Sequence, residues 1–156
     1  DNEEFGLFSD IWNFTIESLV NISLTVDEIN FGTMIPGTTN DTDDDSPPPF
    51  VVQNDGNSLI NISINATTLF TQSPLDNSAY QFKIGNFTIE PSASFNWFGS
   101  LTDWTNMPSA AVVAIDSLKY GDSADSAEVD ILIDILGYEP SGDKTSSVIF
   151  LAELVE

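Results

Sequence analysis

The sequence predicts an all-β fold, an antiparallel β-sandwich of about nine or ten short strands with immunoglobulin-like or jelly-roll connections. Segments in which apolar and polar residues alternate recur along the whole chain, and clusters of turn-forming residues separate them. No segment keeps the period of about 3.6 residues that is typical of an amphipathic helix. The chain has 156 residues, of which 41% are hydrophobic, so it is long enough to bury one substantial core as a single domain.

The opening stretch, IWNFTIESLVNISLTV (residues 11–26), predicts two strands rather than one long strand. From Trp12 to Val26 its even positions are apolar and its odd positions are polar, but the pattern slips at Ser18 and Leu19. A single strand of this length would span roughly 50 Å, whereas a compact chain of this size is about 40 Å across. We therefore expect a hinge at the slip. Residues 1–18 would form an extended N-terminal strand or tail, and residues 19–156 would form the sandwich domain.

The other predicted strands show alternation or dense β-forming residues, and each ends at turn-forming residues. The clearest is LINISINA (59–66), in which Ile residues share one face and Asn and Ser residues share the other. Just before it, Asn54-Asp55-Gly56-Asn57 predicts a tight turn with positive φ. The remaining predicted strands are 19–27, 50–52, 80–84, 87–90, 94–98, 110–115, 128–136 and 147–154, with loops at 36–49, 71–79 and 99–109.

The segment 12–18 carries Trp12, Phe14 and Ile16 on one side, and such an apolar edge is not expected to stay exposed. One interpretation is that the segment adds as a strand to a neighbouring molecule, which satisfies its backbone groups and buries its alternate side chains. A head-to-tail contact of this kind need not close, and it then propagates into a filament. The alternative is a first strand that bends between the two sheets of its own sandwich.

The composition argues against several classes of function. The formal net charge is −22, from 25 acidic residues against three lysines, so nucleic acid and anionic membranes are not expected partners. No apolar run approaches the ~18–20 residues that a membrane-spanning helix needs. The chain has no His, Cys or Arg, so it lacks the usual general base, thiol nucleophile and anion clamp. We therefore expect neither enzymatic activity nor a required cofactor.

The pattern of glycosylation acceptors predicts a secreted protein with N-linked glycans at the cell surface. The chain starts with Asp1 rather than Met, and we interpret it as a mature chain from which a signal peptide has been removed. Several acceptors fall on the predicted polar faces of strands, where a bulky glycan would face solvent. The Asn-X-Ser/Thr acceptors are Asn13, Asn21, Asn40, Asn61, Asn65 and Asn86.

The low-complexity loop PGTTNDTDDDSPPP (36–49) contains a candidate calcium site. Asp41, Asp43 and Asp45 place carboxylates at alternate positions, a spacing that suits hard cations such as Ca²⁺. The loop does not match an EF-hand, because Ser46 replaces the required Gly and Val52 replaces the required Glu. The alternative is a solvated acidic loop that binds no ion.

Aromatic residues offer a second candidate site. They could form a platform on which a sugar ring stacks, although aromatics at strand spacing are more often part of a core. The residues concerned are Trp12, Phe95, Trp97, Phe98 and Trp104.

Three stretches resemble the β-sandwich subunits of prokaryotic extracellular filaments: INFGTMIPGTTNDT (29–42), VVQNDGNSLINISINATTLF (51–70) and ILGYEPSGDKTSSVIFLAEL (135–154). This group includes archaeal adhesive threads, archaeal bundling pili and the TasA-type fibres of biofilms. The resemblance implies a secreted subunit that polymerises by donor-strand complementation through its N-terminal strand. It also implies that Trp12, Phe14 and Ile16 are the donor residues. The acidic loop is a departure from the group's pattern.

Two hypotheses follow from the sequence. The first is a structural subunit of an extracellular filament that binds itself head to tail, with a role in adhesion, cell–cell contact or biofilm through other filaments or cell surfaces. The second is a monomeric secreted or cell-surface module that binds a carbohydrate or acts with calcium. A surface-layer or sheath component shares most features of the first.

Overall fold

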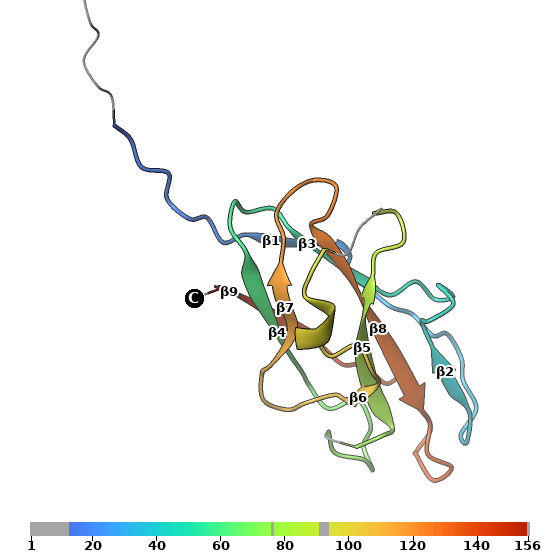
Figure 1. The fold of residues 1–156 in the computed structure, drawn as a ribbon. Coiled ribbons are helices and arrows are strands. Elements are labelled where there is room, and N and C mark those ends of the chain that lie inside the picture. The colour runs from blue at the N-terminus through green and yellow to red at the C-terminus, as the bar shows by residue number, and fades with distance from the viewer. Residues whose placement is uncertain (1–12, 76, 91–93, 156) are drawn as a thin grey trace, which may run out of the picture.

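A computed structural model describes residues 13–75, 77–90 and 94–155, and the described residues contain nine strands (Figure 1). The only helical element among them is a 3₁₀ turn, η1 (Trp97–Gly99). No helix in this part of the chain is long and apolar enough to cross a membrane. The strands are β1 (Ile22–Val26), β2 (Thr39–Asp41), β3 (Phe50–Asn54), β4 (Ile60–Ala66), β5 (Tyr80–Asn86), β6 (Thr105–Asn106), β7 (Val112–Leu118), β8 (Ser126–Asp134) and β9 (Val148–Leu154).

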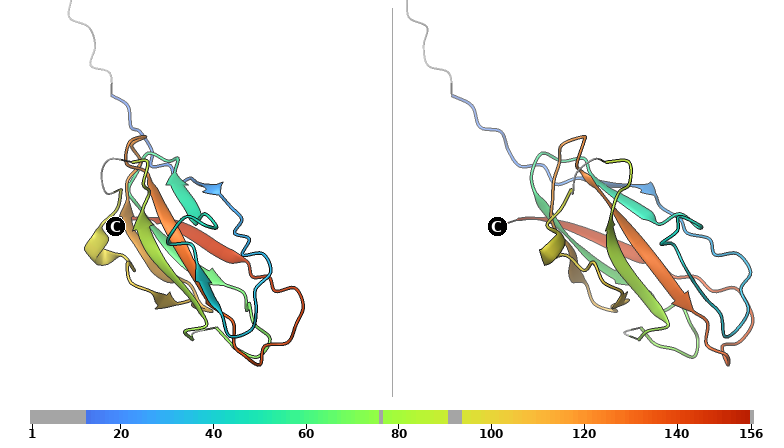
Figure 2. Two further views of the ribbon diagram at one scale, coloured as in Figure 1. Left: turned by 90° about the vertical axis from the view of Figure 1, so that its right-hand side faces the viewer. Right: turned by 45° about the vertical axis from the view of Figure 1, so that its right-hand side comes forward.

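The strands form two antiparallel sheets that pack face to face, so the predicted β-sandwich is confirmed (Figures 1 and 2). The larger sheet has the order β1-β3-β8-β5-β6, and the short strand β2 also pairs with β8. The smaller sheet has three strands in the order β7-β4-β9. The connection at Asn54–Asn57 therefore carries the chain from the larger sheet to the smaller one, rather than closing a hairpin.

Strand β4 shows how the alternation builds the core. Ile60, Ile62 and Ile64 are fully buried, while Asn61 and the other polar residues of the strand face outward. Burying an isoleucine side chain contributes ~1.5–3 kcal/mol, so a one-residue slip in register would lose the whole inner face of the strand. The facing sheet completes the core with Phe82 and other residues of β3, β5 and β8.

The two sides of the sandwich are closed differently. On one side, Leu101 bridges the sheets: its N–H donates to the Ala114 carbonyl of β7 at 2.9 Å, and its carbonyl accepts from Ile84 N of β5 at 2.8 Å. On the other side, Phe150 of β9 packs edge-to-face on Phe50 of β3, with ring centroids 5.7 Å apart. Strand β9 thus lies over β3, and β1 lies one strand further out in the larger sheet.

Four predicted details of the elements are wrong. Residues 87–90 form a turn, in which Glu90 N donates to the Phe87 carbonyl at 3.1 Å, and residues 94–98 run into η1. Conversely, β2 and β6 lie inside segments that were predicted as loops. These two strands are only three and two residues long, so alternation cannot identify them. They form because β2 pairs with β8 and β6 pairs with β5 in the larger sheet.

Candidate functional site

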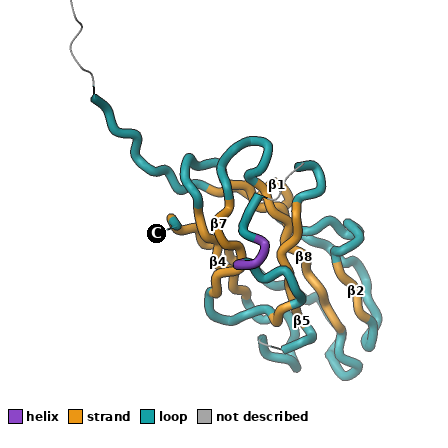
Figure 3. Tube along the Cα trace, viewed as in Figure 1, coloured by secondary structure: helices purple, strands orange, loops and turns teal. Residues whose placement is uncertain are grey.

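The described part of the N-terminal segment, residues 13–21, pairs as a strand with no other described strand. Residues 13–21 carry no strand assignment, and residues 13–20 are all exposed. Phe14 and Ile16 are 84% and 75% exposed. The predicted donor residue Trp12 lies outside the described residues. Figure 3 shows the segment leaving the domain next to β1, and the first strand begins at Ile22 rather than at residue 19.

The segment is held where it crosses the connection between β3 and β4, and Asp55 N donates to the Asn21 carbonyl there at 3.0 Å. Leu19 N donates to Asn57 Oδ1 at 2.7 Å, and Asn57 N donates back to the Leu19 carbonyl at 3.2 Å. Asn57 Nδ2 also donates to the Glu17 carbonyl at 3.0 Å. One asparagine therefore binds the backbone on both sides of Ser18. The predicted hinge at Ser18 and Leu19 coincides with this clamp.

Gly56 makes the clamp sterically possible. A Cβ atom at this position would lie 2.2 Å from the Leu19 carbonyl oxygen. The glycine is thus required by close approach of two backbones. The positive φ that the sequence predicted for this turn is wrong, because the positive-φ positions among the described residues lie elsewhere. The sequence predicts the turn, but it does not show that Asn57 binds the tail or that Gly56 leaves room for it.

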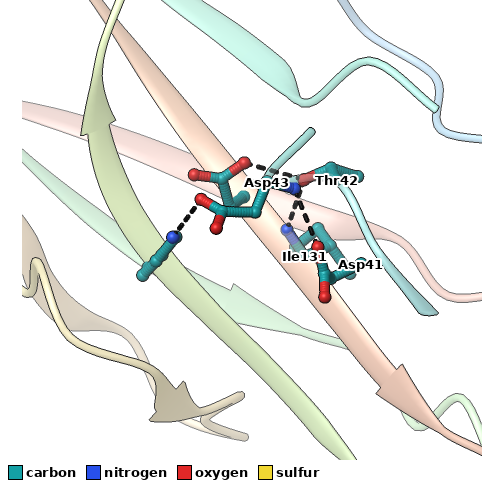
Figure 4. Close-up of polar contacts among 6 residues, drawn as sticks. Asp41, Thr42, Asp43 and Ile131 are labelled. Carbon is teal, nitrogen blue, oxygen red and sulfur yellow. Dashed lines mark hydrogen bonds and ion pairs between the residues drawn. The ribbon is translucent and has the colours of Figure 1, made fainter. Parts of the chain in front are cut away.

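The carboxylates of Asp41 and Asp43 make separate contacts (Figure 4). Asp43 pairs with Lys83 of β5, and Asp41 Oδ1 accepts from Asp43 N at 3.0 Å. Asp45 is exposed and has a positive φ of 60°. Within the described ranges, no group of three or more Asp or Glu side chains is arranged to hold a metal ion. Calcium at Asp41, Asp43 and Asp45 therefore stays a prediction that no contact here supports.

The first turn of this loop buries a carboxylate of the central strand. Thr42 is fully buried, and its Oγ1 donates to Asp130 Oδ1 at 2.9 Å while accepting from Ile131 N at 3.0 Å (Figure 4). Burial raises the pKa of Asp130, while the Thr42 hydrogen bond and the charge of Lys83 oppose the rise. The neighbouring Glu128 is also buried, and burial raises its pKa as well.

One further carboxylate, that of Glu139, connects two loops. Burial works against the charged form of Glu139, but hydrogen bonds from Lys144, Thr71 N and Gln72 N outweigh it and lower its pKa to about 2. The Lys144 Nζ to Glu139 Oε1 distance is 2.8 Å. These contacts join the loop after β8 to the loop after β4. The arrangement is that of a structural brace, because each acceptor oxygen is already occupied.

The glycosylation acceptors occupy three kinds of position. Asn13, Asn21 and Asn86 are exposed. The side chains of Asn61 and Asn65 lie on the outward face of β4 and are half-buried. A sixth, Asn40, is also half-buried, in β2. Asn61 Oδ1 accepts from Ser117 N at 3.0 Å, so this acceptor is tied to the neighbouring strand. Glycans at all six sites remain predictions.

The aromatic residues split between core and surface. Phe95 is buried and stacks on Trp97 with centroids 5.9 Å apart, while Phe98 is 98% exposed. Trp104 instead lies under Lys83, whose Nζ is 4.7 Å from the ring centroid. An open hollow of about 560 Å³ lies at this surface and is lined by Trp97, Phe98, Ser100, Leu101, Thr102, Asp103 and Thr105.

Comparison with known proteins adds no relative. No protein-family model matches the chain, and no curated protein sequence is significantly similar to it. The site must therefore be interpreted from its own geometry.

Proposed function

We propose that the protein is a structural subunit of an extracellular filament, a secreted glycoprotein that polymerises when the N-terminal segment of one copy adds as a strand to the next. The observation that carries the proposal is the exposure of Phe14 and Ile16 in a segment that leaves its own domain. These two large apolar side chains are 84% and 75% exposed to water. Their burial against another molecule would be favourable. Their alternate spacing suits strand addition, which buries every second side chain.

The clamp at Asn57 supports the same proposal. If the tail paired with its own sandwich, the residues before Ser18 would be expected to lie along a sheet edge of that sandwich. Instead, the contacts of Asn57 with Glu17 and Leu19 hold the chain at the end of the domain. A segment that is bound at Glu17 and Leu19 and exposed over residues 13–16 is positioned for another molecule. Such a filament would contact cell surfaces or other filaments. Its role would be in adhesion or biofilm rather than in catalysis.

Electron microscopy of the purified protein, beside a version that lacks residues 1–18, tests the proposal. Filaments from the intact chain and discrete particles from the truncated one are the expected result. Discrete particles from both versions, with equal melting temperatures, would refute it.

A second candidate function is a carbohydrate-binding module, which the exposed Phe98 and the hollow beside Trp97 favour. An aromatic face next to hydroxyl and carboxylate groups suits a neutral sugar ring. This hypothesis expects Phe98→Ala to abolish sugar binding while removal of residues 1–18 leaves it unchanged. Titration of both variants with neutral oligosaccharides distinguishes it from the filament subunit.

A further inference from the structure

Strand β9 lies at the end of the smaller sheet, and one of its two edges has no partner among the described strands. Strand β9 pairs with β4 in an uninterrupted register over seven residue pairs, and no described strand pairs with its other edge. Thr67 N donates to the Ser147 carbonyl, and Val155 N donates to the Leu59 carbonyl. The odd-numbered residues therefore face β4, since hydrogen-bonded pairs alternate along an antiparallel ladder. The backbone groups that face outward belong to Val148, Phe150, Ala152 and Leu154.

The other long edge of the same sheet is already covered. The carbonyls of Ala114 and Asp116 in β7 accept hydrogen bonds from Leu101 N and Asn96 N, each at 2.9 Å. Strand β1, at the end of the larger sheet, has only five residues and contains a register irregularity. Bulges of this kind protect an edge against further pairing. Among the described edges, β9 alone is both long and regular.

The core beneath this edge is incompletely covered. Val148, Phe150 and Ala152 point inward but remain half-exposed, as do Ile22 and Leu24 of β1 in the facing sheet. The smaller sheet has three strands, whereas the path of the larger sheet has five. A fourth strand beside β9 would lie over β1 and would cover both groups of side chains. The sandwich therefore exposes apolar side chains that one more strand would bury.

Building on the proposed function, we infer that the edge of β9 accepts the N-terminal segment of a second copy, and that Phe14 and Ile16 fill the seam between β9 and β1. Charge favours this pairing. Each chain carries a net charge of −22, so two copies repel each other unless uncharged surfaces meet. Residues 148–152 and 13–16 contain no charged residue.

The segment of the same chain fits this edge less well. The end of β9 lies beside the clamp, because Val155 N donates to Leu59 and the tail is bound to Asn57. The carbonyl of Glu17 is bound to Asn57. To reach β9 of its own domain, the chain would therefore have to reverse direction immediately on the N-terminal side of Glu17. That reversal would use Ile16, one of the two apolar residues that must enter the seam. A second copy can supply both.

The absence of cysteine from the chain allows a direct test with mixed single-cysteine variants. Thr15→Cys places a thiol on the outward side of the segment, between Phe14 and Ile16. It is mixed under oxidising conditions with a second variant that carries the thiol on the outward face of β9. Residues opposite each other in adjacent strands have Cβ atoms about 4.5–5.5 Å apart, which is close enough for a disulfide with a small shift. The three β9 variants are Ile149→Cys, Leu151→Cys and Glu153→Cys.

Val113→Cys provides the matched control. Val113 is 45% exposed on β7 at the opposite edge of the same sheet, and Leu151 is 51% exposed. We expect at least one β9 variant to yield at least about ten times more disulfide-linked heterodimer than Val113→Cys. Electron microscopy under reducing conditions first checks that Thr15→Cys still assembles, and Asn13→Cys replaces it if it does not.

The outcomes separate this inference from the proposed function. Filaments with heterodimer yields no higher for β9 than for Val113 would overturn the β9 site and leave the filament proposal standing. A Thr15→Cys/Leu151→Cys double variant that forms only a disulfide within one chain would overturn pairing between copies. If the unsubstituted chain forms no filaments and the mixed single-cysteine variants form no heterodimers, both proposals are overturned.

Discussion

Gly56→Ala is expected to release the N-terminal segment from its clamp. The added Cβ would lie 2.2 Å from the Leu19 carbonyl oxygen, a separation that Cβ atoms essentially never show. Because the obstructing atom belongs to the backbone, the tail must move away from the turn. The movement breaks the two hydrogen bonds between Leu19 and Asn57 and the one between Asn57 and Glu17.

The size of the effect follows from these contacts. Each hydrogen bond contributes ~0.5–1.5 kcal/mol net, and solvent-exposed ones lie at the low end, so the three together contribute about 1.5–2 kcal/mol. Replacement of Gly by Ala also stabilises by ~0.4–1 kcal/mol through the unfolded chain. The net loss in the free energy of unfolding is therefore about 1 kcal/mol, or a fall in melting temperature of ~2–4 °C.

Urea denaturation and amide hydrogen exchange at Leu19 and Asn57 measure this change. Gly137→Ala is the matched control, because its added Cβ would meet nothing within 4 Å. The control should stay within about 0.5 kcal/mol of the unsubstituted chain. Unchanged exchange at both amides in Gly56→Ala, with unchanged stability, would refute the clamp.

Three further predictions concern the carboxylates of the domain. Thr42→Val should lower the free energy of unfolding by ~2–3 kcal/mol in urea denaturation, because it removes one buried hydrogen bond to Asp130 and one to Ile131. Thr42→Ser keeps the hydroxyl and should retain most of the stability, and equal losses for both variants would contradict this reason. Lys83→Gln should raise the pKa of Asp130 further in a carboxyl NMR titration, since the charge of Lys83 lowers it; an unchanged titration would show that the lysine does not act on it. The melting temperature should rise as the pH falls from neutral toward 4.5, the ordinary pKa of Glu128, because the native state binds protons more tightly at carboxyls whose pKa is raised, such as Glu128 and Asp130. It should fall again below about pH 4.5, as Glu139, whose pKa is lowered from 4.5 to about 2, loses its charge; a monotonic fall from pH 7 would contradict the burial of these groups.

The fold was predictable where one strand face is buried and the other is wet. The alternation of 59–66 predicted both the strand β4 and its buried face, because the polar residues that alternate with the isoleucines had to face solvent. The same reasoning would place Asp130, within the predicted strand 128–136, on a solvent-facing side, and there it fails. Thr42 and the adjacent loop cover that side of β8, and the residues that cover it lie almost ninety positions away in the sequence.

The candidate site was predictable only in outline. The slip in alternation at Ser18 and Leu19 predicts a hinge, because a strand cannot keep one face buried through a change of phase. It could not show that Asn57 binds the chain there, since that contact joins residues 38 positions apart. The β9 edge had a signal in VIFLA (148–152), an uncharged run in a highly acidic chain. Its significance depends on the sheet order, which a single sequence does not reveal.

The most direct measurement compares the polymer mass of two doubly substituted chains by sedimentation and electron microscopy. One chain carries Phe14→Asp and Ile16→Asp in the N-terminal segment. The other carries Ile35→Asp and Ile89→Asp, which add the same charge at positions that are 71% and 79% exposed elsewhere on the domain. Strand addition predicts discrete particles from the first chain and filaments from the second, with both domains folded. Filaments in equal amount from both chains would contradict it.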